Sequence, residues 1–221
     1  MVTFKHRAYS GICGLIVVII LSGCQTGVEP SPDPGILRVT LKSNELDTTI
    51  IIQNDTSRFS RWDEFNLFVY GGKVYRGINY AYLYRDRSID RIAADTINIL
   101  KRERLNGNPI TPTDYDDINT KNSRYVKYVI FESYVPPGNY DSLSFALTAN
   151  QLSIFVPKVY TNPVQLPPDE NPQMQIPAHI TVKEGRVTEV NLEILPFSSL
   201  YRYRDSYFFK RKVSIVSINN M

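Results

Sequence analysis

The chain has 221 residues, and its 25 lysines and arginines nearly balance its 22 aspartates and glutamates, for a formal net charge of +3. A balance this close gives no electrostatic basis for binding nucleic acid, which would require a strongly basic face. Hydrophobic residues make up 43% of the chain, so a protein of this length can bury an ordinary core.

The N-terminus has the layout of a secretory signal that ends in a cysteine. A basic stretch, Lys5-His6-Arg7, precedes an apolar run at residues 12–21, which is shorter than the roughly 20 apolar residues of a membrane span. The run ends in Leu21-Ser22-Gly23-Cys24, which matches the lipobox of bacterial lipoproteins position by position. We therefore expect residues 1–23 to be a cleaved signal peptide. The alternative is an uncleaved N-terminal anchor helix.

This match implies how the protein is held in place. In bacterial lipoproteins the cysteine thiol is joined to a diacylglycerol and the new amine is usually acylated, so Cys24 is the expected lipidation site. Each buried methylene contributes about 0.8 kcal/mol, and two or three acyl chains hold a domain at a membrane almost permanently. Gln25 follows, where aspartate would favour the inner membrane. The resemblance thus implies a lipid-anchored protein of the bacterial cell envelope, with the outer membrane favoured, facing the periplasm or the exterior.

Cleavage would leave little reactive chemistry in the mature chain. Cys13 leaves with the signal and Cys24 carries lipid, so no thiol remains for catalysis, a disulfide or a metal. His179 becomes the one remaining histidine, which excludes a multi-histidine metal site. No Gly-x-Ser-x-Gly elbow is present. We therefore expect no enzymatic activity and no cofactor besides the covalent lipid. Hydrolysis by two converging carboxylates is the enzymatic alternative.

The next segment, residues 24–34, is the expected tether. It alternates prolines with small and acidic residues, a composition that forms no core and favours an extended chain. At about 3.1 Å per residue it would lift the domain roughly 30 Å from the lipid. We therefore expect a signal peptide at 1–23, a lipidated cysteine and tether at 24–34, and one β-sandwich domain at 35–221.

Strand signals dominate the rest of the chain. Residues 37–41 alternate apolar and polar side chains, as a half-buried strand does. Further strands are expected at 48–52, 65–70, 73–84, 125–134, 140–147, 180–182, 187–195 and 213–218. Gly71-Gly72 predicts a hairpin turn. Apolar residues at 89–100 have helical spacing and predict a short helix, although residues 96–100 could equally be a strand. Long loops are expected at 105–122 and 157–177, the second because its six prolines oppose continuous strand.

Several stretches, taken in order, resemble an uncharacterised family of bacterial lipoproteins with a prealbumin-like (transthyretin-like) β-sandwich. They are the lipobox and short linker, the opening strand at 35–41, the turn Val135-Pro136-Pro137-Gly138-Asn139-Tyr140, and residues 176–185 leading into 190–194. The resemblance covers about half of the domain, and residues 44–134 depart from it. It implies no enzymatic activity and carries over no catalytic residue. The fold class predicted is all-β: a single prealbumin-like or immunoglobulin-like antiparallel β-sandwich with long loops and at most one short helix.

The candidate ligand-binding residues are aromatic. Tyr80, Tyr82 and Tyr84 share one face of a predicted strand, and Trp62 is the one tryptophan. A tyrosine offers a flat apolar ring with a polar tip, which suits sugar stacking or a protein interface, although it also suits ordinary packing on a half-buried sheet face.

Two charged segments are weaker candidates. Asp114, Asp116 and Asp117 could supply calcium ligands, but the EF-hand pattern is not met, and a solvated acidic loop is the alternative. The basic segments 201–204 and 210–212 could face an anionic membrane surface or form a solvated strand and loop.

These patterns predict a non-catalytic interaction or structural module of the cell envelope. Its expected partners are the membrane, through the lipid anchor, and an unknown envelope protein or glycan. No nucleic acid is expected. The alternatives are a carbohydrate-binding surface lipoprotein and, less favoured, a carboxylate-based glycoside hydrolase.

Overall fold

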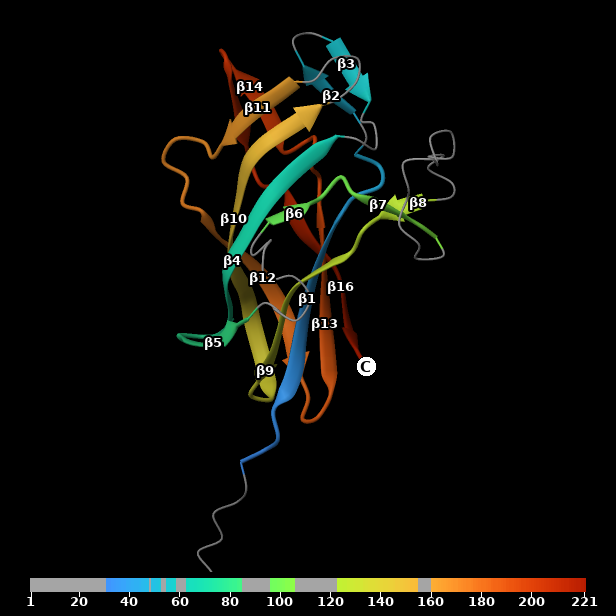
Figure 1. The fold of residues 1–221 in the computed structure, drawn as a ribbon. Helices are drawn as coiled ribbons and strands as arrows, with labels where there is room; N and C mark the ends of the chain where they lie inside the picture. Colours follow the sequence, from blue (N-terminus) through green and yellow to red (C-terminus); the bar gives the residue numbers. More distant parts are fainter. Residues whose placement is uncertain are drawn as a thin grey trace, which may run out of the picture. The chain divides into compact units, whose positions relative to one another are not determined.

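The computed structural model describes residues 31–47, 49–52, 55–58, 63–84, 96–105, 123–154 and 160–221. Residues from Asp33 to Met221 form one compact unit. Its described part contains sixteen strands and no helix, and its sheets pack as a sandwich, which confirms the all-β prediction (Figure 1). Within those ranges, no helix is long and apolar enough to cross a membrane.

The smaller sheet has four strands in the order β16-β13-β1-β9. They are β1 (Gly35–Ser43), β9 (Tyr128–Val135), β13 (Val187–Ile194) and β16 (Val213–Asn220). β1 lies between an antiparallel partner, β9, and a parallel partner, β13. The parallel pairing of β1 with β13 differs from the antiparallel pairing that the sequence predicts. No hairpin joins these two strands. A tight turn forces neighbours to run antiparallel, and strands far apart in sequence are free of that constraint.

The larger sheet is built on two long strands. Its order is β14-β15-β11-β10-β4-β5, with β12 also pairing with β10 and β6 with β4. The strands are β4 (Glu64–Arg76), β5 (Asn79–Leu83), β6 (Thr96–Asn98), β10 (Gly138–Ile154), β11 (Tyr160–Gln165), β12 (Gln173–Val182), β14 (Leu200–Tyr203) and β15 (Ser206–Phe209). One edge of β10 pairs with β12 along its first half and with β11 along its second half. β11 and β15 form the second parallel pair.

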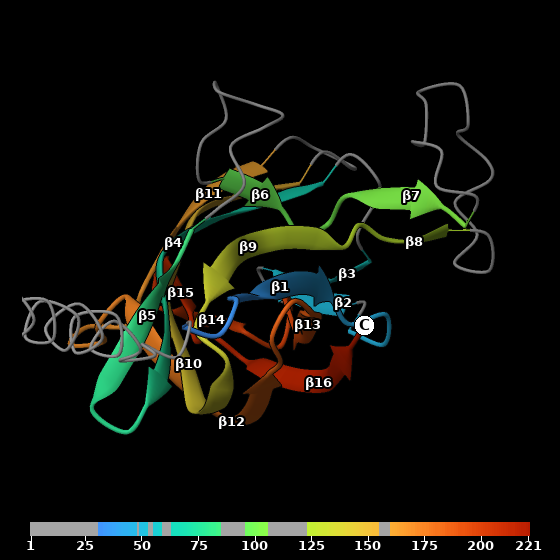
Figure 2. The same ribbon diagram turned by 90° about the horizontal axis from the view of Figure 1, so that it is seen from below.

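Two separate hairpins complete the described strands. One consists of β2 (Thr49–Ile52) and β3 (Asp55–Arg58), and the other of β7 (Arg102–Arg104) and β8 (Ser123–Tyr125). Figure 2 shows β9, β1, β13 and β16 lying side by side, with β10, β4 and β5 forming the other layer.

The core lies between the inner faces of the two sheets. Leu37, Val39 and Leu41 of β1 are fully buried, as the alternating pattern predicts. From β9, the Phe131 ring meets the Phe145 ring of β10 edge-on, with centroids 6.0 Å apart. This contact joins the two layers beneath the middle of β4.

The Gly71-Gly72 pair does not form the predicted hairpin turn. It lies inside β4, where the register against β10 shifts between Ser144 and Ala146. Gly71 has φ +65°, and a left-handed glycine with one extra residue is the mark of a β-bulge. The turn lies six residues later, at Gly77-Ile78, where Arg76 pairs with Asn79. Asn-Gly-type turns and glycine bulges use the same backbone freedom, so the dipeptide alone could not distinguish them.

The proline-rich segment is also more regular than predicted. Part of the expected loop at 157–177 belongs to β11 and β12, and Pro177 lies within β12 opposite Ser142. The register of β12 against β10 shifts at that point. A proline is tolerated beside a bulge and on an edge strand, because no ladder hydrogen bond needs its missing N–H.

Two residues of the turn at 135–140 have clear structural roles. Gly138 has φ +148°, a conformation that side chains rarely adopt. Tyr140 is 4% exposed and donates its hydroxyl hydrogen to the Pro136 carbonyl oxygen at 2.6 Å. Burial raises the pKa of this hydroxyl. The motif therefore closes a turn and packs the core.

Candidate functional site

One outward face of the larger sheet gathers tyrosines from the β4–β5 hairpin. Tyr80, Tyr82 and Tyr84 alternate along β5 and its end, and they are 47%, 51% and 67% exposed. The register places Tyr75 opposite Tyr80 and Lys73 opposite Tyr82. Directly opposite residues project from the same side of a sheet. We call these five residues the tyrosine face.

The rings of the tyrosine face contact one another at steep angles. Tyr80 and Tyr82 have centroids 5.2 Å apart at 87°, and their hydroxyl oxygens are 3.3 Å apart. The Tyr82 and Tyr84 rings are 6.5 Å apart at 39°, and those of Tyr75 and Tyr80 are 5.6 Å apart at 50°. The hydrogen bond with Tyr80 is the main cause that raises the pKa of Tyr82. The face is therefore corrugated, and its rings do not form one flat platform.

Lys73 supplies a positive charge in the middle of these rings. Its Nζ atom lies 4.4 Å from the centroid of the Tyr80 ring and 5.4 Å from that of Tyr82. Both distances fall within the range of a cation–π contact. Among the described residues, Lys73 has no carboxylate partner. Its charge thus remains available to an incoming group.

The tyrosine face continues into a polar strip on β10 and β12. The register aligns Ser142 and Ser144 of β10 with outward residues of β4. Gln175 Nε2 donates to Ser142 Oγ and Gln173 Nε2 donates to Ser144 Oγ, both at 2.8 Å. Both serines are buried beneath these contacts, so the outward surface passes from the tyrosine rings to the exposed carboxamide groups of Gln173 and Gln175 on β12.

The outward face of the smaller sheet differs, because its charges pair with one another. Arg38 forms ion pairs with Glu132 and Glu189, and Lys127 Nζ lies 2.6 Å from Glu189 Oε1. The hydrogen bond from Lys127 is the main cause that lowers the pKa of Glu189. The hydrogen bond to Glu132 is the main cause that raises the pKa of Arg38. These internal pairs leave little unsatisfied charge to recognise a partner.

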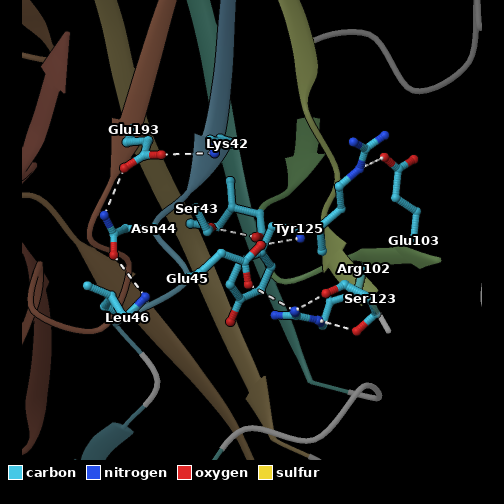
Figure 3. A network of polar contacts seen from close by, with 12 residues as sticks. Lys42, Ser43, Asn44, Glu45, Leu46, Arg102, Glu103, Ser123, Tyr125 and Glu193 are labelled. Carbon is cyan, nitrogen blue, oxygen red and sulfur yellow. Dashed lines mark hydrogen bonds and ion pairs between the residues drawn. The ribbon is translucent and has the colours of Figure 1, made fainter. Parts of the chain in front are cut away.

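A third polar cluster fastens the β7–β8 hairpin to the end of β1 (Figure 3). Glu45 accepts hydrogen bonds from Arg102 Nη2 at 2.9 Å and from the Tyr125 backbone N–H at 2.8 Å. The Arg102 guanidinium also bonds Ser123 and lies 4.3 Å from the centroid of the Tyr125 ring. Burial is the main cause that raises the pKa of Tyr125. Each group is used within the fold, so the cluster is structural.

The predicted basic segments are partly used within the fold as well. Arg211 donates to the carbonyl oxygens of Asn171 and Pro172 at 2.7 Å and pairs with Glu170 at 2.9 Å. It fixes the loop between β11 and β12 and does not face solvent as a free charge.

Five predicted site residues lie outside the described residues. They are Cys24, Trp62, Asp114, Asp116 and Asp117. Within the described ranges, no group of three or more histidines, cysteines or carboxylates could hold a metal ion.

The sequence predicted that Tyr80, Tyr82 and Tyr84 share one face, but it did not predict the residues that lie beside them. Lys73 comes from β4, whose register with β10 and β5 depends on the Gly71 bulge and the Gly77 turn, and Gln173 and Gln175 come from β12, whose register with β10 shifts near Pro177. The alternation of Ser142 and Ser144 was a signal for a polar side of β10, although both side chains are buried by their neighbours. Nothing local indicated which strands those neighbours would come from.

No family model, curated protein or solved structure matches the chain significantly.

Proposed function

We propose that the protein is a non-catalytic interaction module of the bacterial cell envelope. It is anchored through lipid on Cys24 and contacts an envelope protein through the tyrosine face. The observation that carries the proposal is the gathering of four tyrosines around Lys73 on an exposed sheet face. Tyrosine is enriched among the residues that dominate binding energy at protein interfaces.

The contrast between the two outward faces supports this choice of surface. The smaller sheet pairs its charged groups internally, whereas the tyrosine face presents rings, hydroxyls and one cation to solvent. Rigid aromatic side chains supply contact area at low entropic cost, since a tyrosine has few rotatable bonds to order.

A carbohydrate-binding surface lipoprotein is the second candidate. The exposed carboxamide groups of Gln173 and Gln175 favour it, because sugars need hydrogen-bonding partners beside an aromatic ring. The ring angles favour a protein partner, since a flat sugar stacks best on exposed rings that lie in one plane.

The test is a pull-down of the tagged, full-length lipoprotein from its own envelope, run beside a glycan array. The variant is Tyr80→Ser with Tyr82→Ser. The matched control is Tyr134→Ser on β9, which is 74% exposed on the other sheet. We expect one protein to co-purify in stoichiometric amount with wild type and control, and to be lost with the double variant. Retention of that protein by the double variant would refute the proposal. A glycan signal without a protein partner would favour the second candidate.

A further inference from the structure

The β5 strand forms one edge of the larger sheet, at the left of Figure 1. It follows a two-residue turn at Gly77-Ile78, and a β-turn of this kind closes with a hydrogen bond between the residues that flank it, Arg76 and Asn79. Bonded and non-bonded pairs then alternate along an antiparallel ladder. Asn79, Ala81 and Leu83 therefore bond β4, while the backbone groups of Tyr80 and Tyr82 point away from it.

The contacts of Tyr84 confirm this alternation independently. By the same count its backbone groups also point away from β4, and there they bond β9. The Tyr84 N–H donates to Ser133 Oγ at 2.6 Å, and the Glu132 N–H donates to the Tyr84 carbonyl oxygen at 2.8 Å. The outer edge of β5 is thus occupied by β9 at Tyr84 and open, among the described residues, at Tyr80 and Tyr82.

Among the described residues, no segment covers this edge at Tyr80 and Tyr82. Edge strands are commonly blocked by lysine, proline, a bulge or a covering segment. β5 carries neither lysine nor proline, and its register with β4 is unbroken. Two N–H and two C=O groups are therefore presented in the geometry of a strand that can accept a neighbour.

We propose that β5 binds an extended, acidic peptide segment of a partner protein by strand addition, a proposal that rests on the tyrosine face being the interaction surface. Main-chain hydrogen bonds to Tyr80 and Tyr82 fix the added strand. Its outward side chains lie about 4.5–5.5 Å from those of Tyr80 and Tyr82, measured between Cβ atoms. Lys73 Nζ, above the same rings, selects a carboxylate at one of these positions.

The first test needs no ligand. Amide hydrogen exchange of the full-length lipidated protein in detergent should be fast at Tyr80 and Tyr82 and slow at Ala81 and Leu83. The reason is that the first two amides face outward and the second two bond β4. Slow exchange at Tyr80 and Tyr82 would mean that the chain already pairs this edge itself, which would overturn the proposal.

The second test uses a display library of eight-residue peptides that alternate Asp or Glu with Val or Thr, and a matched library with Lys in the acidic positions. We expect acidic members to bind and basic members to fail, with the preference reversed by Lys73→Glu. If no acidic peptide binds at concentrations up to about 1 mM, the proposal is overturned.

Backbone modification separates strand addition from ordinary side-chain contact. A bound peptide N-methylated on the alternate amides that face β5 should lose at least tenfold in affinity, and one methylated on the other amides should not. On the protein side, Tyr82→Pro and Tyr82→Thr both lose the ring, but proline alone also loses the outward N–H. We expect Tyr82→Pro to bind at least tenfold more weakly.

The outcomes for the two proposals differ. Equal binding of both N-methylated peptides would refute strand addition while leaving the tyrosine face as an interaction surface. An envelope partner that binds regardless of Tyr80→Ser and Tyr82→Ser would refute the proposed function itself.

Discussion

Replacing Gly72 with alanine should destabilise the domain by overpacking the core directly beneath the tyrosine face. A Cβ atom at this position would lie 2.8 Å from Cε1 and Cζ of Phe131 and 2.9 Å from Cβ of Leu83. The new carbon is attached to the backbone of β4, so it cannot rotate away. Overpacking a well-packed core typically costs about 1–3 kcal/mol, and three simultaneous contacts this short place Gly72→Ala near about 3 kcal/mol.

The effect is large enough to measure by thermal or urea denaturation. For a domain of this size, 1 kcal/mol corresponds to a Tm shift of about 2–4 °C, so we expect Gly72→Ala to lower Tm by about 6–12 °C. Gly77→Ala provides a contrast, because its added carbon meets nothing within 4 Å but its φ is +60°. Backbone strain alone predicts a loss of about 1–2 kcal/mol there.

A double-mutant cycle identifies the cause. Phe131→Leu removes the ring atoms that the new methyl group would strike. The loss of stability in the double variant should therefore be smaller, by at least about 1 kcal/mol, than the sum of the losses in the two single variants. The same Phe131→Leu change should leave the cost of Gly77→Ala unaltered. Additive free energies for Gly72→Ala and Phe131→Leu, or a Gly72→Ala variant as stable as wild type, would refute the steric reasoning.

Three further predictions address the anchor, the turn and one ion pair. Cys24→Ala should leave an unlipidated precursor in detergent phase partitioning, and an unmodified thiol at residue 24 of the wild-type protein, found by mass spectrometry, would contradict the lipid anchor. Tyr140→Phe should lower the free energy of unfolding by about 1–2 kcal/mol, because it leaves the Pro136 carbonyl without its 2.6 Å hydrogen bond; an unchanged urea midpoint would argue against this. The hydrogen bond from Lys127 is the main cause that lowers the folded-state pKa of Glu189 from 4.5. The ionised carboxylate therefore stabilises the fold above pH 4.5, and this stabilisation is lost as the pH falls through the lower, folded-state pKa. Wild type should therefore lose more stability than Glu189→Gln between about pH 5 and pH 3, and parallel pH profiles would exclude this linkage.

Local patterns were enough to identify many strands. The alternation of Leu37, Val39 and Leu41 predicted a half-buried strand, and all three side chains are buried. A β-strand places successive side chains on opposite faces, so two-residue periodicity reports the face directly. The same rule placed Tyr80, Tyr82 and Tyr84 together on one surface, and they are exposed there.

Turns, bulges and loops were predicted less accurately from glycine and proline, because the effect of these residues depends on the strands that surround them. Gly71 takes a left-handed conformation inside a strand, and Gly77 takes one in a turn. Gly72 is required for a different reason, since only the absence of a Cβ atom lets the Phe131 ring pack against β4. Pro177 fits within β12 because that strand pairs on one side near a register shift.

The sequence by itself determined the strand character of most of the domain, the side of β5 that carries its tyrosines, and the expectation of a lipid anchor at Cys24. The tertiary structure alone decided that β1 lies parallel to β13, that Lys73 lies among the tyrosine rings, and that no other described strand pairs with the outer edge of β5 at Tyr80 and Tyr82. The physical reason is that periodicity acts over a few neighbouring residues. Strand pairing depends on contacts between segments far apart in the chain, and a single bulge or turn changes which side chains meet.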